Sequence, residues 1–294
     1  MNKVIVIVGP TGVGKTKLST ILAKKLDGEI INADSTQVYK GLDIATAKVT
    51  KKEQENIPHH LFDIKNVEED YTVYDYQKDS RSKIEEILAK NKTPIMVGGT
   101  GLYIKASLYN YDFNEEQIKY NYDSFSNDEL YEKLLVIDPN TTIHKNNRKR
   151  VERALNYYEI NHQVLSSKNK SERLLYDAII IGLTLDRNIL YTRINERVDQ
   201  MVNNGLIEEA KHLYQSNIRT KAVLTPIGYK ELFEYFDGQK ELSECIELIK
   251  QKSRKYAKRQ YTWFNNQMNV KWFNVNLENF DDTVNEILEY IKRY

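Results

Sequence analysis

The sequence predicts an α/β protein, in which a parallel sheet is flanked by helices and a small, mostly helical domain is inserted. Two observations lead to this expectation. Within the first hundred residues, short apolar runs alternate with segments of helical periodicity, a pattern typical of β–α units and a parallel sheet. Between about residues 113 and 175 this alternation stops, and Tyr-, Asn- and acid-rich sequence gives way to helical pieces. We therefore expect a core of residues 1–112 and 176–294, interrupted by an insertion domain at 113–175.

The first strand is expected at residues 4–8, and it leads directly into the sequence GPTGVGKT at 9–16. This sequence fits G-x-x-x-x-G-K-[ST], the phosphate-binding loop (P-loop) of P-loop NTPase-like folds, whose glycines let backbone N–H groups face phosphate oxygens. Lys15 adds a positive charge, and the Thr16 hydroxyl is placed to hold Mg²⁺. A helix is expected at 17–26, with its N-terminus facing the same anion. The predicted phosphate-binding residues are Gly9, Thr11, Gly12, Val13, Gly14, Lys15 and Thr16.

The other elements are predicted from hydrophobic periodicity. Buried strands are expected at 29–33, 60–64, 93–97, 178–183 and 270–275. Helices are expected at 73–90, around 130–135, at 148–155, along the stripe of Leu190, Ile194, Val198 and Met201, and at 280–291. The buried-strand pattern thus returns after the insertion, which indicates two halves of one domain.

Composition restricts the classes of partner. The chain has 294 residues and a net charge of +1, so affinity for nucleic acid has to come from local basic clusters. Its single cysteine, Cys245, forms no internal disulfide and builds no metal cluster. We see no signal peptide before the first strand and no apolar stretch of the ~18 residues that a membrane span needs. We therefore expect a cytoplasmic protein without a membrane segment.

Polar residues follow two of the expected strands, at the edge where open α/β sheets bind their ligands. Asp34 follows the strand at 29–33, and its carboxylate could hold Mg²⁺ through water, act as a general base or cap a following helix. Gly98, Gly99 and Thr100 follow the strand at 93–97. They form either a plain turn or a close backbone approach that offers the Thr100 hydroxyl to a bound oxyanion.

Two basic clusters are candidates for phosphate contacts. Arg150 and Arg153 are three residues apart in an expected helix and lie on one face, and guanidinium groups suit phosphate. Six basic residues lie between 250 and 259 without one acid, and aromatic residues are interleaved or follow directly. This second cluster indicates either a nucleic-acid surface or a solvated helix whose aromatic residues belong to the core.

A histidine pair, His59 and His60, stands at the entrance of the strand expected at 60–64. A zinc site would need a third His, Cys or carboxylate at ligand spacing, and none follows. We therefore expect surface residues or a contact with a substrate at this position.

In combination, these segments resemble the tRNA dimethylallyltransferases, which prenylate the adenosine just 3′ of the anticodon, at tRNA position 37. Each segment is moderately specific, and the ordered set spans nearly the entire chain. The matching segments are GPTGVGKT (9–16), DSTQVY (34–39), GLDIATAK (41–48), PHHLFD (58–63), GGTGLY (98–103), RVERAL (150–155), IGY (227–229) and KRQYTWF (258–264).

The resemblance implies that the loop at 9–16 binds the diphosphate of dimethylallyl diphosphate, and that the prenyl group passes to N6 of adenosine 37. Asp34 would accept the N6 proton, whereas Lys15, Thr100, Arg150 and Mg²⁺ on Thr16 would stabilise the leaving diphosphate. Asp34 as a magnesium ligand, or another carboxylate (Asp43) as the base, remain alternatives. The partner would be the anticodon stem-loop of tRNA, with its target base pulled out of the stack, and the protein would be a monomer. The implied tRNA-binding residues are Ser35, Thr36, Gln37, His59, His60, Arg153, Lys258, Arg259 and Gln260.

Two other classes of function stay open. A small-molecule kinase would bind ATP in the same loop, with Arg150 and Arg153 as lid residues, but it would leave the segment 258–264 without a role. A non-catalytic RNA-binding protein of this fold would be expected to lack Asp34 or Thr16, and both are present.

Overall fold

The computed structural model describes residues 3–111, 120–167 and 173–294. The chain divides into two compact units, one of Met1–Tyr109 with Leu174–Tyr294 and one of Asn110–Arg173. The insertion expected at 113–175 therefore corresponds to a unit whose boundaries lie a few residues earlier in the chain. The first unit contains the sheet and the phosphate loop.

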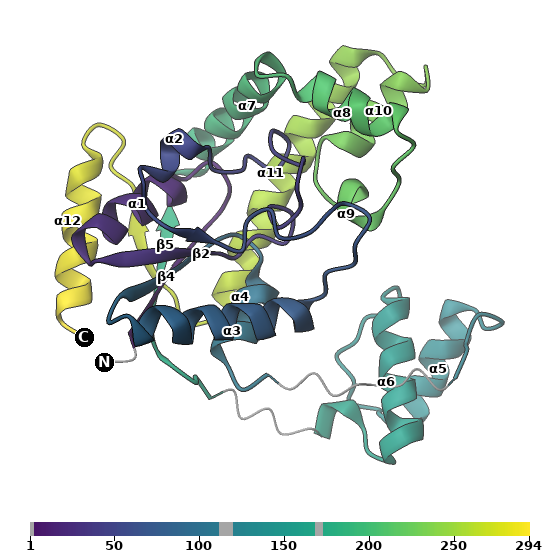
Figure 1. Cartoon of the computed structure of the whole chain (residues 1–294). Helices are drawn as coiled ribbons and strands as arrows, with labels where there is room; N and C mark the ends of the chain where they lie inside the picture. Colours follow the sequence, from purple (N-terminus) through teal and green to yellow (C-terminus); the bar gives the residue numbers. More distant parts are fainter. Residues whose placement is uncertain (1–2, 112–119, 168–172) are drawn as a thin grey trace. The chain divides into compact units, whose positions relative to one another are not determined.

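The sheet confirms the expected fold class. It has six parallel strands in the order β3-β2-β4-β1-β5-β6, with β1 and β4 at its centre. Figure 1 labels β2, β4 and β5 of this sheet, with α1 on one side of them and α3 on the other. Ile5 of β1 pairs with Ile95 of β4 and Ile179 of β5, so the apolar runs of three strands lie in register. The strands are β1 (Lys3–Val8), β2 (Gly28–Asn32), β3 (His59–His60), β4 (Thr93–Val97), β5 (Asp177–Thr184) and β6 (Lys271–Asn274).

Both faces of the sheet are covered, which is why the central strand β1 and its neighbours β4 and β5 are mostly apolar. Alternate residues of β1 enter different clusters: Val4 and Val6 pack on the side of α3 and α4, whereas Ile5 and Ile7 pack on the side of α1 and α12. The helices of this unit are α1 (Lys15–Lys25), α2 (Lys51–Gln54), α3 (Val73–Ala89), α4 (Gly101–Leu108), α7 (Arg187–Asn203), α8 (Leu206–Gln215), α9 (Lys221–Leu224), α10 (Tyr229–Phe236), α11 (Leu242–Gln267) and α12 (Phe280–Lys292).

One strand prediction was wrong in its extent. The strand expected at 60–64 is only the two-residue β3, His59–His60. Leu61 and Asp63 adopt left-handed backbone conformations, with φ of 63° and 54°, which interrupt an extended strand. The chain after β3 therefore turns instead of continuing along the sheet edge.

The second unit is helical, as expected. Its helices α5 (Asn127–Ile137) and α6 (Arg148–Asn161) pack through Leu130, Leu134 and Val151, and a short 3-10 helix, Leu165–Ser167, follows. Arg148 stabilises the start of α6, since its guanidinium donates to the carbonyl oxygens of Tyr122 and Phe125.

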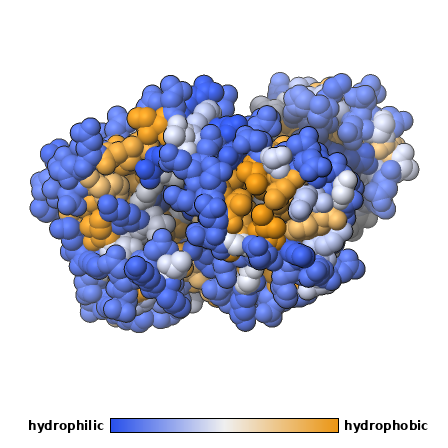
Figure 2. Space-filling model, turned by 90° about the horizontal axis from the view of Figure 1, so that it is seen from above, coloured by the Kyte–Doolittle hydropathy of each residue, from blue (hydrophilic) through white to orange (hydrophobic). Residues whose placement is uncertain are grey.

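Hydrophilic residues dominate the face drawn in Figure 2, and hydrophobic residues gather there in restricted areas. Among the described residues, Ile189, Leu277 and Leu224 are large apolar side chains that stay about 40 % exposed (44 %, 44 % and 38 %). Across the described ranges, we find no helix with the length and apolarity needed to cross a membrane.

Candidate active site

The phosphate loop lies between β1 and α1, and its glycines are required by the backbone. Gly9, Gly12 and Gly14 have φ of 138°, 83° and 102°, values that side chains with a Cβ rarely adopt. A Cβ on Gly9 would also lie 2.6 Å from the carbonyl oxygen of Leu183 in β5. The sequence motif therefore forms the tight turn it predicts, and Gly14 leads into the N-terminus of α1.

Lys15 closes over this loop. Its Nζ donates to the carbonyl oxygens of Gly9 and Pro10 at 2.9 and 2.8 Å. Burial, together with the positive charge of Arg197, lowers the pKa of Lys15 to about 7, and the charge of Asp34 opposes this shift. An anion bound in the loop would favour the charged form of this lysine, because it would add an opposite charge at close range.

Two arginines of α7 reach the phosphate loop, and sequence reasoning missed them. Arg193 donates from Nε to the carbonyl oxygen of Gly12 at 3.0 Å, and Arg197 donates from Nη1 to Oγ1 of Thr11 at 3.2 Å. The two arginines are four residues apart and share one face of the helix. Burial lowers the pKa of Arg197. The predicted apolar stripe of α7 lies in the core except for Met201, which is partly buried, and the basic pair stands beside this stripe.

Asp34 forms a turn, so the helix-cap alternative was wrong. Its Oδ1 accepts hydrogen bonds from the backbone N–H of Thr36 at 2.9 Å and from the Thr36 hydroxyl at 2.7 Å. The next helix along the chain, α2, begins only at Lys51 and is capped by Thr50. Within the described residues, Oδ2 of Asp34 makes no hydrogen bond, which leaves one carboxylate oxygen available as a proton acceptor.

Thr100 connects the ends of β2 and β4. Its Oγ1 accepts a hydrogen bond from the backbone N–H of Ser35 at 3.0 Å and donates to the Ser35 hydroxyl at 3.3 Å. A Cβ on Gly98 would lie 2.2 Å from the carbonyl oxygen of Ala33, so this position requires glycine. The glycine thus allows a close approach of the protein's own backbone, and a contact of the Thr100 hydroxyl with a bound oxyanion stays a prediction.

Gln260 has a different role from the one we expected. The resemblance predicts a contact of Gln260 with tRNA, but its side chain is buried and its amide bridges two loops. Its Oε1 accepts from the N–H of Thr11 at 3.1 Å, and its Nε2 donates to the carbonyl oxygen of Gly99 at 3.1 Å. A Cβ on Gly99 would meet this amide at 2.1 Å. The amide is therefore committed to holding the phosphate loop against the end of β4.

The basic segment of α11 separates into two faces. Lys258 and Arg259 are exposed, and the Arg259 guanidinium lies 5.5 Å from the ring centre of Tyr256. Two of the aromatic residues pack inside the fold. Phe264 is in the core, and Trp263 packs against Gly101, where the missing Cβ leaves room for its ring. The charges are thus available to a polyanion, whereas we find these two rings packed in the fold instead of presented to unpaired bases.

Three predicted tRNA contacts are engaged elsewhere in the fold. Nε2 of His60 lies 2.7 Å from the Glu29 carboxylate near the amino end of β2, opposite the strand ends that carry the phosphate loop. Nδ1 of His59 lies 2.8 Å from the carbonyl oxygen of Ile57, and burial lowers the pKa of this histidine. Gln37 donates from Nε2 to the carbonyl oxygen of Thr46 at 2.8 Å. Within the described residues neither histidine is hydrogen-bonded to Asp34, and Nε2 of His59 is buried without a hydrogen-bond partner.

Arg150 and Arg153 lie on α6 in the second unit, and both are exposed. Their placement at a diphosphate or at tRNA stays a prediction. Asp43, the alternative base, forms an ion pair with Lys48 at 2.7 Å, which favours Asp34 as the proton acceptor.

The residues present fit a magnesium ion that is held mainly by its substrate. Thr16 stands exposed in the first turn of α1, and among the described residues its hydroxyl has no hydrogen-bond partner. Within those residues, no group of three or more His, Cys, Asp or Glu side chains could hold a metal. Mg²⁺ commonly takes one or two protein oxygens and completes its shell with phosphate and water, so Thr16 suits it.

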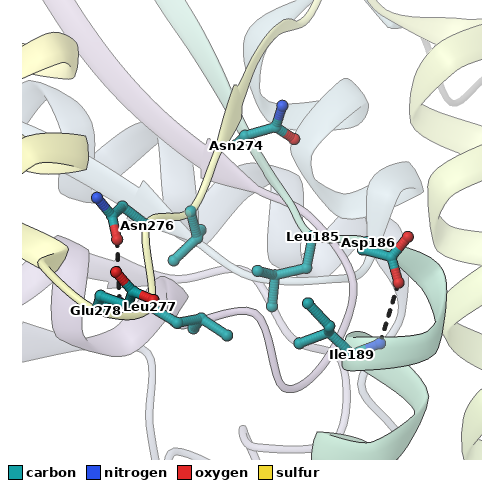
Figure 3. A pocket seen from close by; sticks show the side chains of 8 residues that line it. Leu185, Asp186, Ile189, Asn274, Asn276, Leu277 and Glu278 are labelled. Carbon is teal, nitrogen blue, oxygen red and sulfur yellow. Dashed lines mark hydrogen bonds between the residues drawn. The ribbon is translucent and has the colours of Figure 1, made fainter.

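A surface pocket of about 570 Å³ lies at the carboxyl ends of β5 and β6. Figure 3 shows the side chains of Leu185, Ile189 and Leu277 converging in it, with Asn274 and Asp186 at its margin. None of the predicted site residues lines this pocket. It is therefore separate from the phosphate loop and from Asp34.

Comparison with known proteins agrees with this geometry. The family model described as IPP transferase matches residues 37–267. The tRNA dimethylallyltransferase of Anoxybacillus flavithermus is 51 % identical over 300 residues, covering 99 % of this chain and 96 % of that protein. The tRNA dimethylallyltransferase of Bacillus subtilis is 48 % identical over 284 residues, covering 92 % and 90 %.

Two solved structures are also similar. The tRNA isopentenylpyrophosphate transferase of Bacillus halodurans is 44 % identical, with a TM-score of 0.79 over 99 % of this chain and 96 % of that one. A eukaryotic dimethylallyltransferase acting on tRNA is 32 % identical, with a TM-score of 0.88 over 99 % of this chain and 78 % of that one. With a family model that matches residues 37–267 and full-length relatives of this identity, the chain belongs to the tRNA dimethylallyltransferase (IPP transferase) family.

Proposed function

We propose that this protein transfers the dimethylallyl group of dimethylallyl diphosphate to N6 of adenosine 37 in the tRNA anticodon loop. The observation that carries the proposal is the juxtaposition of an anion site with a carboxylate. Asp34 is close enough to Lys15 for its charge to act on the lysine, and its Oδ2 is free within the described residues. A kinase would use the same anion site, but family membership and this carboxylate favour alkyl transfer.

The leaving group would be stabilised from the side of β1. Backbone N–H groups of the phosphate loop, the N-terminus of α1, Lys15 and the α7 pair Arg193 and Arg197 all supply positive charge there. Mg²⁺, bound by Thr16 and diphosphate oxygens, would neutralise part of the charge that develops on diphosphate. These donors would make the C1–O bond of the prenyl donor easier to break.

The acceptor would be activated from the side of β2. The lone pair of N6 is delocalised into the adenine ring, so the amine is a poor nucleophile until it loses a proton. As N6 attacks C1 and the C1–O bond breaks, Oδ2 of Asp34 accepts the N6 proton, and diphosphate leaves. Thr100 and Ser35 hold the backbone beside Asp34 and so help to fix its carboxylate.

The RNA would be held mainly by charge. We propose that Lys258 and Arg259 on α11, with Arg153 on the second unit, contact phosphates of the anticodon stem-loop, whereas Arg150 keeps its predicted role at the diphosphate. Ser35 and Thr36 would form part of the wall around the flipped base.

Asp34→Asn tests the assignment of the base. The variant removes the proton acceptor and keeps the size of the side chain, so turnover should fall by at least about a hundredfold, the usual contribution of general base catalysis. Pyrophosphate binding should survive with affinity lowered by no more than about twofold, because Asp34 makes no hydrogen bond to the loop and loss of its negative charge removes a repulsion of the anion. The matched control is Asp27→Asn before β2, which should behave as the parent. Near-normal turnover of Asp34→Asn would contradict the proposal. So would transfer of phosphate from ATP to a small acceptor by the parent protein in place of prenyl transfer.

A further inference from the structure

The loop that carries Asp34 continues to residue 48 and is held by a single carboxylate of α8. Glu209 accepts hydrogen bonds from the backbone N–H groups of residues 43–45, at 3.0, 2.9 and 3.1 Å. Tyr229, the first residue of α10, donates its hydroxyl to the same carboxylate at 2.7 Å, and its side chain is fully buried. Three successive N–H groups around one carboxylate form a backbone nest of the kind that holds an anion.

The start of α10, which carries Tyr229, approaches the loop at 43–45 closely. A Cβ on Gly228, which has a φ of 134°, would lie 3.3 Å from Cβ of Ala45. Burial and the neighbouring Glu209 raise the pKa of Tyr229, so its phenol stays protonated and keeps donating at neutral pH. The Glu209 carboxylate is therefore held by three backbone N–H groups and by one phenol that stays protonated.

Further contacts connect the nest to the turn at Asp34. Residue 46 follows the nest directly, and its carbonyl oxygen accepts the Nε2 hydrogen bond of Gln37. Gln37 in turn follows the Asp34–Thr36 turn. Lys48, which also follows the nest, connects it to the preceding segment, since its buried ammonium donates to the carbonyl oxygen of Tyr39 at 2.6 Å. The backbone between Asp34 and residue 48 is thus fixed at both of its ends and in its middle.

We propose that Glu209 is a positioning residue, which holds the loop at 43–45 and thereby fixes the Asp34 carboxylate for proton transfer. Its catalytic consequence rests on the function proposed above. The inference gives a physical role to two sequence segments that the reaction itself does not use, GLDIATAK at 41–48 and IGY at 227–229. It predicts that Glu209 of α8 affects turnover, although its hydrogen bonds go to the loop at 43–45 and not to the phosphate loop.

The test compares Glu209→Gln with Glu208→Gln, a neighbouring exposed residue of the same helix. Glu209→Gln keeps the side-chain size but removes the charge that the three N–H groups face. We expect kcat to fall by about tenfold or more, because the loop loses a charged hydrogen-bond acceptor and the conformation that places Asp34 becomes less populated. The dissociation constant of pyrophosphate should stay within about twofold of the parent value, because Glu209 does not touch the phosphate loop. Glu208→Gln should match the parent in both.

Tyr229→Phe provides a milder variant, should Glu209→Gln not fold. It removes only the hydroxyl that orients Glu209, so we expect a decrease in kcat of about three- to tenfold. Amide hydrogen exchange over residues 36–48 should be faster in both variants, and exchange over residues 3–16 should be unchanged. Hydrogen exchange thus shows whether Glu209 holds the loop at 43–45, independently of any measurement of activity.

Several outcomes would overturn the inference. One is parent-like exchange over 36–48 in both variants, and another is parent-like kcat despite faster exchange. A third is a loss of pyrophosphate binding in proportion to kcat, which would indicate general destabilisation and not positioning. If the parent protein transferred no prenyl group, the proposed function would fail, and the exchange measurement would still decide whether Glu209 holds the loop.

Discussion

Replacing the buried Gln260 with alanine should lower both the stability of the protein and its affinity for pyrophosphate. The Gln260 amide is the bridge between the phosphate loop at Thr11 and the end of β4 at Gly99, through hydrogen bonds of 3.1 Å on each side. Alanine would leave an N–H and a carbonyl group without these partners and would open a gap between the two loops. The variant therefore tests whether α11 acts on the site through this side chain.

The expected magnitude follows from the burial of the two groups. Gly99 is buried, so its carbonyl would lose its partner at a cost of about 1 to 3 kcal/mol, whereas water can reach the part-exposed Thr11. With about 1 kcal/mol more for the packing lost at the gap, the free energy of unfolding should fall by about 2 to 4 kcal/mol in total. In a domain of this size each kcal/mol lowers the melting temperature by about 2 to 4 °C, which gives a decrease of about 4 to 16 °C.

Thermal unfolding and pyrophosphate titration measure the two consequences. The loop should also bind pyrophosphate less tightly, by about tenfold, since Thr11 would no longer be fixed for the anion. The control is Gln251→Ala, an exposed position on the same helix, which should change the free energy of unfolding by less than about 0.5 kcal/mol. If Gln260→Ala melted within 1 °C of the parent and bound pyrophosphate equally well, the bridge would not matter, and our reasoning would be refuted.

Three further predictions concern charge. Because the pKa of Lys15 is lowered to about 7 in the folded protein, the unfolded chain binds one more proton between about pH 7 and 10.5, so stability should rise with pH over that window. Urea unfolding at several pH values should show this rise, and Lys15→Met should abolish it; an equal slope in the variant would contradict the assignment. Arg197→Ala should weaken pyrophosphate binding by about tenfold or more in calorimetric titration, and an unchanged affinity would remove this residue from the site. The double variant Lys258→Ala and Arg259→Ala should reduce the slope of log affinity for tRNA against log salt by about 1 to 2, whereas an unchanged slope would place the RNA elsewhere.

The parts of the molecule that could be predicted from sequence are those determined locally. The phosphate loop was predicted because its glycines are needed for backbone conformations that a short motif specifies, and the strands because both faces of the sheet are covered. The position of Asp34 after β2 followed for the same reason, since parallel strands end at one edge of the sheet.

What sequence reasoning missed depends on contacts between distant segments. Arg193 and Arg197 reach the phosphate loop only because α7 packs against it, 180 residues or more along the chain, and no local pattern shows that packing. Gln260 stands within a segment that resembles the family, but its role was assigned wrongly because its helix brings the amide inward. The strand at β3 was overestimated because left-handed backbone at Leu61 and Asp63 is not apparent from an apolar run.

The most direct test of the central claim is prenyl transfer itself. Purified protein, Mg²⁺ and labelled dimethylallyl diphosphate would be incubated with two transcripts of the same unmodified tRNA, one with adenosine and one with guanosine at position 37. Nucleoside analysis should find the label on N6 of adenosine 37 in the first transcript and no label in the second, with loss of transfer in Asp34→Asn. Equal labelling of both transcripts, or no transfer to either while ATP is consumed with a small acceptor, would contradict the account.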